Sequence, residues 1–150
     1  MTDDTFLTRN IGSILIKGDI NTVSKEYVAE GSVKAGMIVM SGSAKGKCAP
    51  ATDATTKILG VCLGRADTDL DTAVTDGETC RVALRGTGAH CWVWAKGGIA
   101  AIGVGEQLQA TTTSGQVERW DTGNHATAAT IMSLDEQAQS SDLKLIKALI

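Results

Sequence analysis

The sequence predicts an all-β protein: a compact β-barrel or β-tulip-like body, built from two similar strand units, with an extended N-terminal arm. Aromatic residues make up only 3% of the 150 residues, whereas small and β-branched side chains, which suit pleated strands, are abundant. With 17 glycines and 1 proline, the turns between short apolar runs depend on Gly, Asp, Asn and Ser. The third observation is a faint internal repeat.

Residues 1–30 differ from the rest and are expected to form an extended arm with one short strand. Glycine and asparagine interrupt their apolar side chains and prevent a continuous helical pattern. The bulky apolar residues of this arm include Phe6, Leu7, Ile11 and Ile14. They need cover from the chain's own body or from a partner. We expect residues 31–150 to form a single β domain.

Two stretches, residues 33–86 and residues 103–150, repeat the same order of features. Each reads as strand, glycine turn, strand, polar turn, apolar strand, connector and strand. A duplication of this kind is expected to pack as one closed or sandwiched β body, because each half has a face that it cannot bury alone. The last segment, residues 143–150, also fits helical spacing, but the repeat favours a strand.

Between the two units, Trp92 and Trp94 alternate with Cys91 and Val93. In a strand the two tryptophans point to one face, while Cys91 and Val93 point to the other. Neighbouring tryptophans on one face form either a core anchor or an interface, and the sequence leaves both interpretations open. The same alternation separates His90 from Cys91, so these two residues are not expected to form a nucleophile–base dyad.

An acidic segment offers a weak calcium candidate. Asp67, Asp69, Asp71 and Glu78 match loop positions one, three, five and twelve of an EF-hand. Thr72 replaces the glycine of position six, and the flanks read as strands rather than helices. The four cysteines are far apart and form no Cys-x-x-Cys pair, so we expect reduced, buried thiols and no cofactor.

Composition and motifs argue against several classes of function. A net charge of −3 does not suit nucleic acid, which is bound by concentrated basic surfaces. No stretch is apolar enough to span a bilayer, and the acidic start lacks a secretory signal, so we expect synthesis in a cytoplasm and no membrane partner. No nucleophile elbow or zinc-protease motif is present, and we expect no enzyme. An enzyme that uses Cys91 is the remaining catalytic alternative.

Several strand-and-turn runs carry a family resemblance. They are residues 33–39, 58–62, 75–86, 104–108 and 115–117. These runs resemble the small capsid decoration, or cement, proteins of tailed phages, which are similar to the lambda-type head decoration protein. The resemblance covers about residues 30–150. It implies a β-barrel or β-tulip subunit that often forms homotrimers on an icosahedral capsid, with an N-terminal arm on the major capsid protein.

The predicted function is therefore structural: the protein binds the outer surface of a phage capsid and stabilises the contacts between capsomers. The expected location is the virion, and the expected partners are the major capsid protein and further copies in a homotrimer. The candidate contact residues are Phe6, Leu7, Ile11, Ile14, Trp92 and Trp94. The alternatives are another virion component, such as a head fibre base or a tail protein, and a calcium- or ligand-binding β module.

Overall fold

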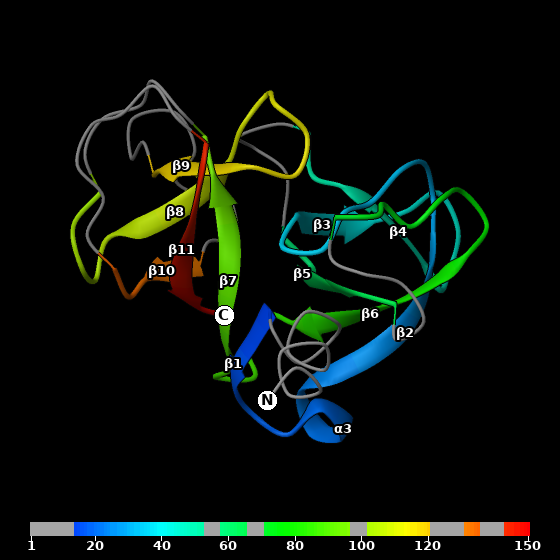
Figure 1. The fold of residues 1–150 in the computed structure, drawn as a ribbon, viewed down its shortest axis with the longest axis horizontal. Helices are drawn as coiled ribbons and strands as arrows, with labels where there is room; N and C mark the ends of the chain where they lie inside the picture. The colour runs from blue at the N-terminus through cyan, green and yellow to red at the C-terminus, as the bar shows by residue number, and fades with distance from the viewer. Residues whose placement is uncertain (1–13, 53–57, 66–70, 97–101, 121–130, 136–142) are drawn as a thin grey trace.

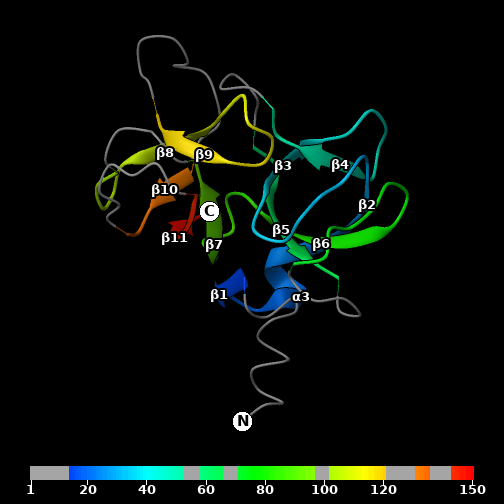
Figure 2. The same ribbon diagram turned by 45° about the horizontal axis from the view of Figure 1, so that its top comes forward.

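A computed structural model describes residues 14–52, 58–65, 71–96, 102–120, 131–135 and 143–150. Two closed five-stranded β-barrels lie side by side (Figures 1 and 2). The first consists of β2 (Ser24–Ala29), β3 (Ile38–Ser41), β4 (Lys47–Pro50), β5 (Gly60–Gly64) and β6 (Thr79–Leu84). The second consists of β7 (His90–Ala95), β8 (Gln107–Ala110), β9 (Val117–Arg119), β10 (Ile131–Ser133) and β11 (Lys144–Leu149). The predicted all-β class and the two similar strand units are confirmed.

Both barrels have the same strand order and the same strand directions. In the first, β2 pairs with β6, β6 with β5, β5 with β3 and β3 with β4, all antiparallel, and a parallel β2–β4 pair closes the barrel. Strands β7, β11, β10, β8 and β9 repeat this circuit. The closing pair is Ala29 with Cys48 in the first barrel and Ala95 with Val117 in the second. The repeat therefore extends to individual residue positions.

Each unit closes on itself, whereas the sequence analysis expected both units to share one closed body. The reason is a fifth strand that precedes each predicted unit: β2 lies before residue 33, and β7 lies before residue 103. This strand pairs with both edge strands of its unit, so no open edge is left to join the other unit. Within the predicted arm, Ser24–Ala29 thus forms part of the first barrel, and residues 1–13 lie outside the described residues.

Two short elements precede the first barrel. Strand β1 (Leu15–Lys17) pairs antiparallel with β7 of the second barrel, with Leu15 opposite Cys91. Helix α3 (Ile20–Val23) follows, and the Asp19 side chain caps it by accepting a hydrogen bond from Asn21 N at 3.0 Å. The start of the described chain is therefore attached to the second barrel before the chain builds the first.

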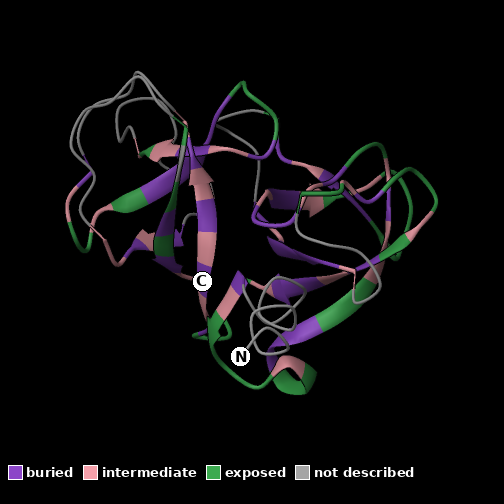
Figure 3. Cartoon of the chain, in the orientation of Figure 1, coloured by how far each residue is buried: buried purple, intermediate pink, exposed green. Residues whose placement is uncertain are grey.

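The core has two apolar clusters. Figure 3 shows that buried residues lie on the strands of both barrels. The interior of the first barrel holds Ala29, Val33, Val39, Cys48, Cys62, Val74, Cys80 and Val82. Ile38 and Val61 point away from that interior by strand alternation, and they join a cluster that includes Val93 and Leu108 of the second barrel. All five residues of β5 are buried because this strand is covered on both of its faces.

The turn between β8 and β9 connects the barrels directly. Gly115 O accepts a hydrogen bond from Ile38 N at 3.1 Å, and Gly115 N donates one to Ala51 O at 2.9 Å. Gly115 has a φ of +76°, and a Cβ atom there would lie 2.6 Å from Met37 Cγ. Glycine is therefore required by the backbone conformation and by the close approach of the two barrels.

Candidate functional site

The alternation predicted for β7 is confirmed. Cys91, Val93 and Ala95 are fully buried inside the second barrel, and the tryptophans between them are half-buried on its outer side. Strand β11 places Lys147 opposite Trp92 and Leu145 opposite Trp94. We call this outer surface the Trp face and define it by four residues: Trp92, Trp94, Leu145 and Lys147.

Trp94 lies at the junction of the two barrels. Its indole Nε1 donates a hydrogen bond to Ala35 O at 3.0 Å, and its backbone N donates one to Gly36 O at 3.2 Å. A Cβ atom on Gly36 would lie 3.0 Å from the indole Nε1. The Lys34 Nζ lies 5.3 Å from the centroid of the ring. Trp94 therefore anchors the first barrel on the second, as a core residue would.

The rest of the Trp face is more open to solvent. Trp92 packs partly against the core cluster, and Lys147 Nζ lies 5.4 Å from the centroid of its ring. A cation–π contact at an exposed site contributes about 0.5–1 kcal/mol. Leu145 is 37% exposed, and Leu143, just before β11, is 46% exposed. The tryptophans thus combine a packing role with a surface that leaves apolar area uncovered.

The other candidate contact residues fall into two groups. Ile14 is buried in the chain's own core, so the structure places it inside the protein rather than on a surface that a partner could reach. It packs there because β1, which follows it directly, adds to the sheet of the second barrel. Phe6, Leu7 and Ile11 lie outside the described residues. Their role as capsid contacts stays a prediction.

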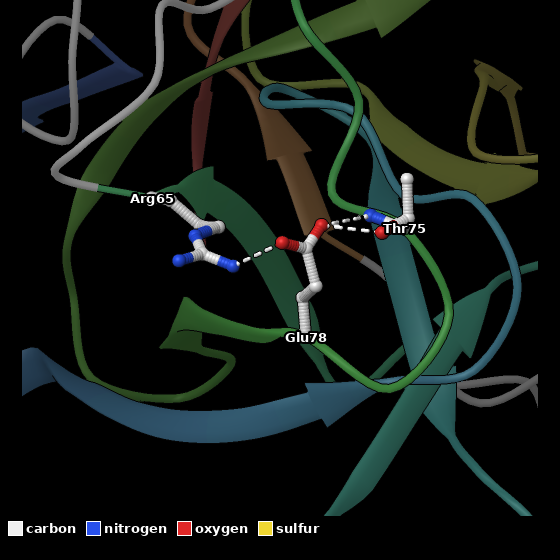
Figure 4. Close-up of polar contacts among 3 residues, drawn as sticks. All are labelled: Arg65, Thr75 and Glu78. Carbon is white, nitrogen blue, oxygen red and sulfur yellow. Dashed lines mark hydrogen bonds and ion pairs between the residues drawn. The ribbon is translucent and has the colours of Figure 1, made fainter.

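Glu78 of the acidic segment is engaged by neighbouring side chains (Figure 4). Its Oε2 lies 2.6 Å from Arg65 Nη1, and its Oε1 accepts hydrogen bonds from the backbone N and the hydroxyl of Thr75. Asp67 and Asp69 lie outside the described residues, and Asp71 is exposed. Calcium would have to displace Arg65 or Thr75 from Glu78, which disfavours the twelfth ligand position of a calcium loop.

Calorimetric titration of calcium into the protein is expected to give no saturable heat, and Asp69→Ala and Glu78→Ala should behave alike. Glu78→Ala is expected to lower the free energy of unfolding by about 1 kcal/mol, because it removes a partly exposed ion pair and the hydrogen bonds to Thr75. Denaturant unfolding measures this loss. A saturable heat that both substitutions remove would instead establish a calcium site.

All four cysteines are buried and free, as the sequence analysis expected. Inside the first barrel the Sγ atoms of Cys48 and Cys80 lie 3.8 Å apart, and this contact, followed by burial, raises the pKa of Cys48. Burial raises the pKa of Cys91 to about 12. The Cys91 thiol is therefore protonated at neutral pH and points away from the half-buried His90. This arrangement does not favour an enzyme that uses Cys91.

The buried Cys91 thiol is expected to make the protein less stable at alkaline pH. The unfolded thiol loses its proton near pH 9, whereas the folded thiol keeps it up to a pKa of about 12. Stability is thus fully present below pH 9 and falls above it, by about 1.4 kcal/mol per pH unit for one thiol. Denaturant unfolding between pH 8 and 11 measures this dependence. In Cys91→Ala the free energy of unfolding should fall less steeply with pH, because the contribution of one thiol is removed. Equal slopes would contradict this account.

The sequence analysis did not identify Lys34, Leu145 or Lys147 as neighbours of the tryptophans. Their proximity depends on the pairing of β7 with β11 and on the contact between the barrels. A lysine four residues before a strand gives no sequence signal of that kind.

In the described part of the chain, no helix has the length and apolar character to cross a membrane.

Comparison with known proteins gives an informative likeness to a solved structure. No protein-family model matches the chain, and no curated protein matches it in sequence. Among solved structures, it is similar to the N base of the head fiber protein gp8.5 of bacteriophage phi29, with a TM-score of 0.52 and 18% sequence identity. The likeness covers 85% of this chain and 92% of that chain. At this identity it shows that the two chains share a fold.

Proposed function

We propose that this chain is a structural component of a phage head, attached to the outside of the shell as a head fibre base. The observation that carries this proposal is the fold likeness to the phi29 head fiber base, which extends over most of both chains. It agrees with the resemblance of the sequence to virion proteins, which was found from separate strand-and-turn runs. Together they favour a virion role that needs no catalytic residues.

The likeness favours a fibre base over a cement protein at the capsomer seams, which was the first interpretation of the sequence. In the proposal, the partner is the major capsid protein, and Phe6, Leu7 and Ile11 together with the Trp face are the contact candidates. The hydrogen-bonded contact between the barrels supports such a role, because separate contact regions on one connected chain gain affinity from their effective concentration. The homotrimer implied by the resemblance stays a prediction.

Quantitative mass spectrometry of purified virions tests this proposal, with the chain measured against the major capsid protein. We expect the chain to be present at well below one copy per capsid subunit, as for a fibre that occupies a subset of sites. One copy per capsid subunit would favour the cement protein instead. Complete absence from virions would reject both the fibre base and the cement protein. It would favour a ligand-binding β module.

A further inference from the structure

The two barrels provide an internal comparison for the Trp face. Their shared register places each outward residue of β7 and β11 at the position of an outward residue of β2 and β6. In the first barrel, the positions that correspond to the Trp face hold Glu26, Val28, Thr79 and Arg81. The same fold is therefore formed with mainly polar side chains at these positions. The aromatic and leucine side chains of the second barrel are not a requirement of the barrel itself.

Exposed apolar side chains gather around the Trp face. Among the described residues, four large hydrophobic side chains are exposed, and three of them are Ile16, Leu143 and Leu145. Ile16 belongs to β1, which lies on one side of β7, and Leu145 belongs to β11, which lies on the other. Apolar surface that is concentrated on one side of a protein marks an interaction site.

The described chain begins beside this face. Strand β1 runs antiparallel to β7, with Leu15 opposite Cys91. Followed backward from Leu15, the direction of the chain is therefore from Cys91 towards Trp92 and Trp94. The described chain therefore starts beside Trp92, at the edge of β7.

A further strand has little edge of β7 left to pair with in that direction. Trp94 N already donates to Gly36 O, and Ala95 pairs with Val117 of β9. The barrel interior on the other side of β7 is filled by buried side chains. The outer face of β7 is open to a segment that continues from β1.

Residues 1–13 carry side chains that complement the Trp face. Their large apolar side chains are Phe6, Leu7 and Ile11, and their charged side chains are Asp3, Asp4 and Arg9. The Trp face offers apolar area and the ammonium group of Lys147, and Lys34 of the first barrel lies beside it; each ammonium group is close to an indole ring. Thirteen residues reach about 45 Å when extended or about 20 Å as a helix, and the six residues of β7 span about 20 Å.

We propose that residues 1–13 bind the Trp face of the same chain in the free protein. Phe6, Leu7 and Ile11 cover the apolar area, and the carboxylates of Asp3 and Asp4 lie near Lys34 and Lys147. The segment thereby shields, before assembly, the apolar surface of the second barrel. When the protein attaches to a phage head, residues 1–13 leave the Trp face, and both become free to contact the head. This consequence rests on the proposed function.

Zero-length carbodiimide coupling of the full-length free protein tests this pairing, because it joins a carboxylate to an amine only when the two groups meet. We expect amide crosslinks from Asp3 or Asp4 to Lys34 or Lys147, within one chain and with a yield that dilution does not change. Lys25 and Lys47, exposed on the first barrel, provide matched control amines. Peptide mass spectrometry identifies each crosslink.

Three outcomes would overturn the proposal: no crosslink to Lys34 or Lys147, equal yields at the control lysines, or crosslinks that form only between chains. Since the measurement uses the free protein, its result does not depend on whether the chain binds phage heads. A failure of the proposed function and a failure of this inference are therefore distinguishable.

Tryptophan fluorescence gives a second measurement in a Trp120→Phe background, where Trp92 and Trp94 are the remaining tryptophans. Changing Phe6, Leu7 and Ile11 together to serine is expected to increase quenching by acrylamide, because the rings lose their cover. Circular dichroism checks that the barrels remain folded. Unchanged quenching in a folded variant would also overturn the proposal.

Discussion

Replacing Phe6, Leu7 and Ile11 together by serine is expected to weaken the binding of the protein to phage heads. Burial of one large apolar side chain contributes about 1.5–3 kcal/mol, and 1.4 kcal/mol corresponds to about a tenfold change in affinity. Because these side chains already cover the Trp face in the free protein, the net loss is smaller than the sum of three contacts, and we expect binding to weaken by about tenfold or more. Co-sedimentation with heads from which the protein has been stripped measures the loss.

The matched control for this experiment changes Thr2, Thr5 and Thr8 of the same segment to alanine. These substitutions remove small polar groups, and we expect them to leave the affinity for heads nearly unchanged. Truncation is a poorer test if it extends to residue 16, because Ile14 belongs to the core and Leu15–Lys17 forms β1. Normal occupancy of heads by the folded serine variant would exclude these three residues as head contacts.

Gly60→Ala is expected to be the most damaging single substitution in the first barrel. A Cβ atom at this position would lie 2.0 Å from Ala83 O, which is backbone and cannot move aside as a flexible side chain would. Gly60 pairs with Leu84 of β6 and with Val39 of β3, so a shift here disturbs two strand pairs. We expect a loss of about 3 kcal/mol in the free energy of unfolding, measured by denaturant unfolding.

Gly31→Ala is the control that separates this clash from the general cost of replacing a glycine. Gly31 has a φ of +82°, and no atom lies within 4 Å of a Cβ placed there. Its replacement should cost about 1–2 kcal/mol, which is the price of a left-handed backbone for alanine. An equal loss in the free energy of unfolding for Gly60→Ala and Gly31→Ala would contradict this account. It would show that the close approach of β5 to β6 adds no cost to the substitution.

Local features of the chain follow from residues that are neighbours in the sequence. Strand alternation predicted that Trp92 and Trp94 share a face, because a period of two depends only on the local backbone. The repeat predicted two similar strand units, because equivalent turns require glycine at equivalent places, as at Gly36 and Gly105 with φ of +88° and +85°. Strand alternation and the glycine of each turn both depend on residues that are close together in the sequence.

The candidate site depended on contacts between distant segments. Lys34 reaches Trp94 from 60 residues earlier in the chain, and Ala35 accepts its indole hydrogen bond. Glu78 is engaged by Arg65 and Thr75, which the calcium pattern in the sequence did not reveal. The buried position of Ile14 depends in the same way on the pairing of β1 with a strand that begins at His90.

The sequence by itself determined the all-β class, the duplication and the alternating faces of the strands, because each follows from local backbone preference and from the spacing of apolar residues. Only the tertiary structure decided that each unit closes into its own barrel, because closure depends on the strand that precedes the unit and pairs with both of its edges. It also decided which apolar side chains stay exposed. Two positions of the same register, Glu26 and Trp92, have different surroundings because one barrel carries β1 beside this position and the other does not.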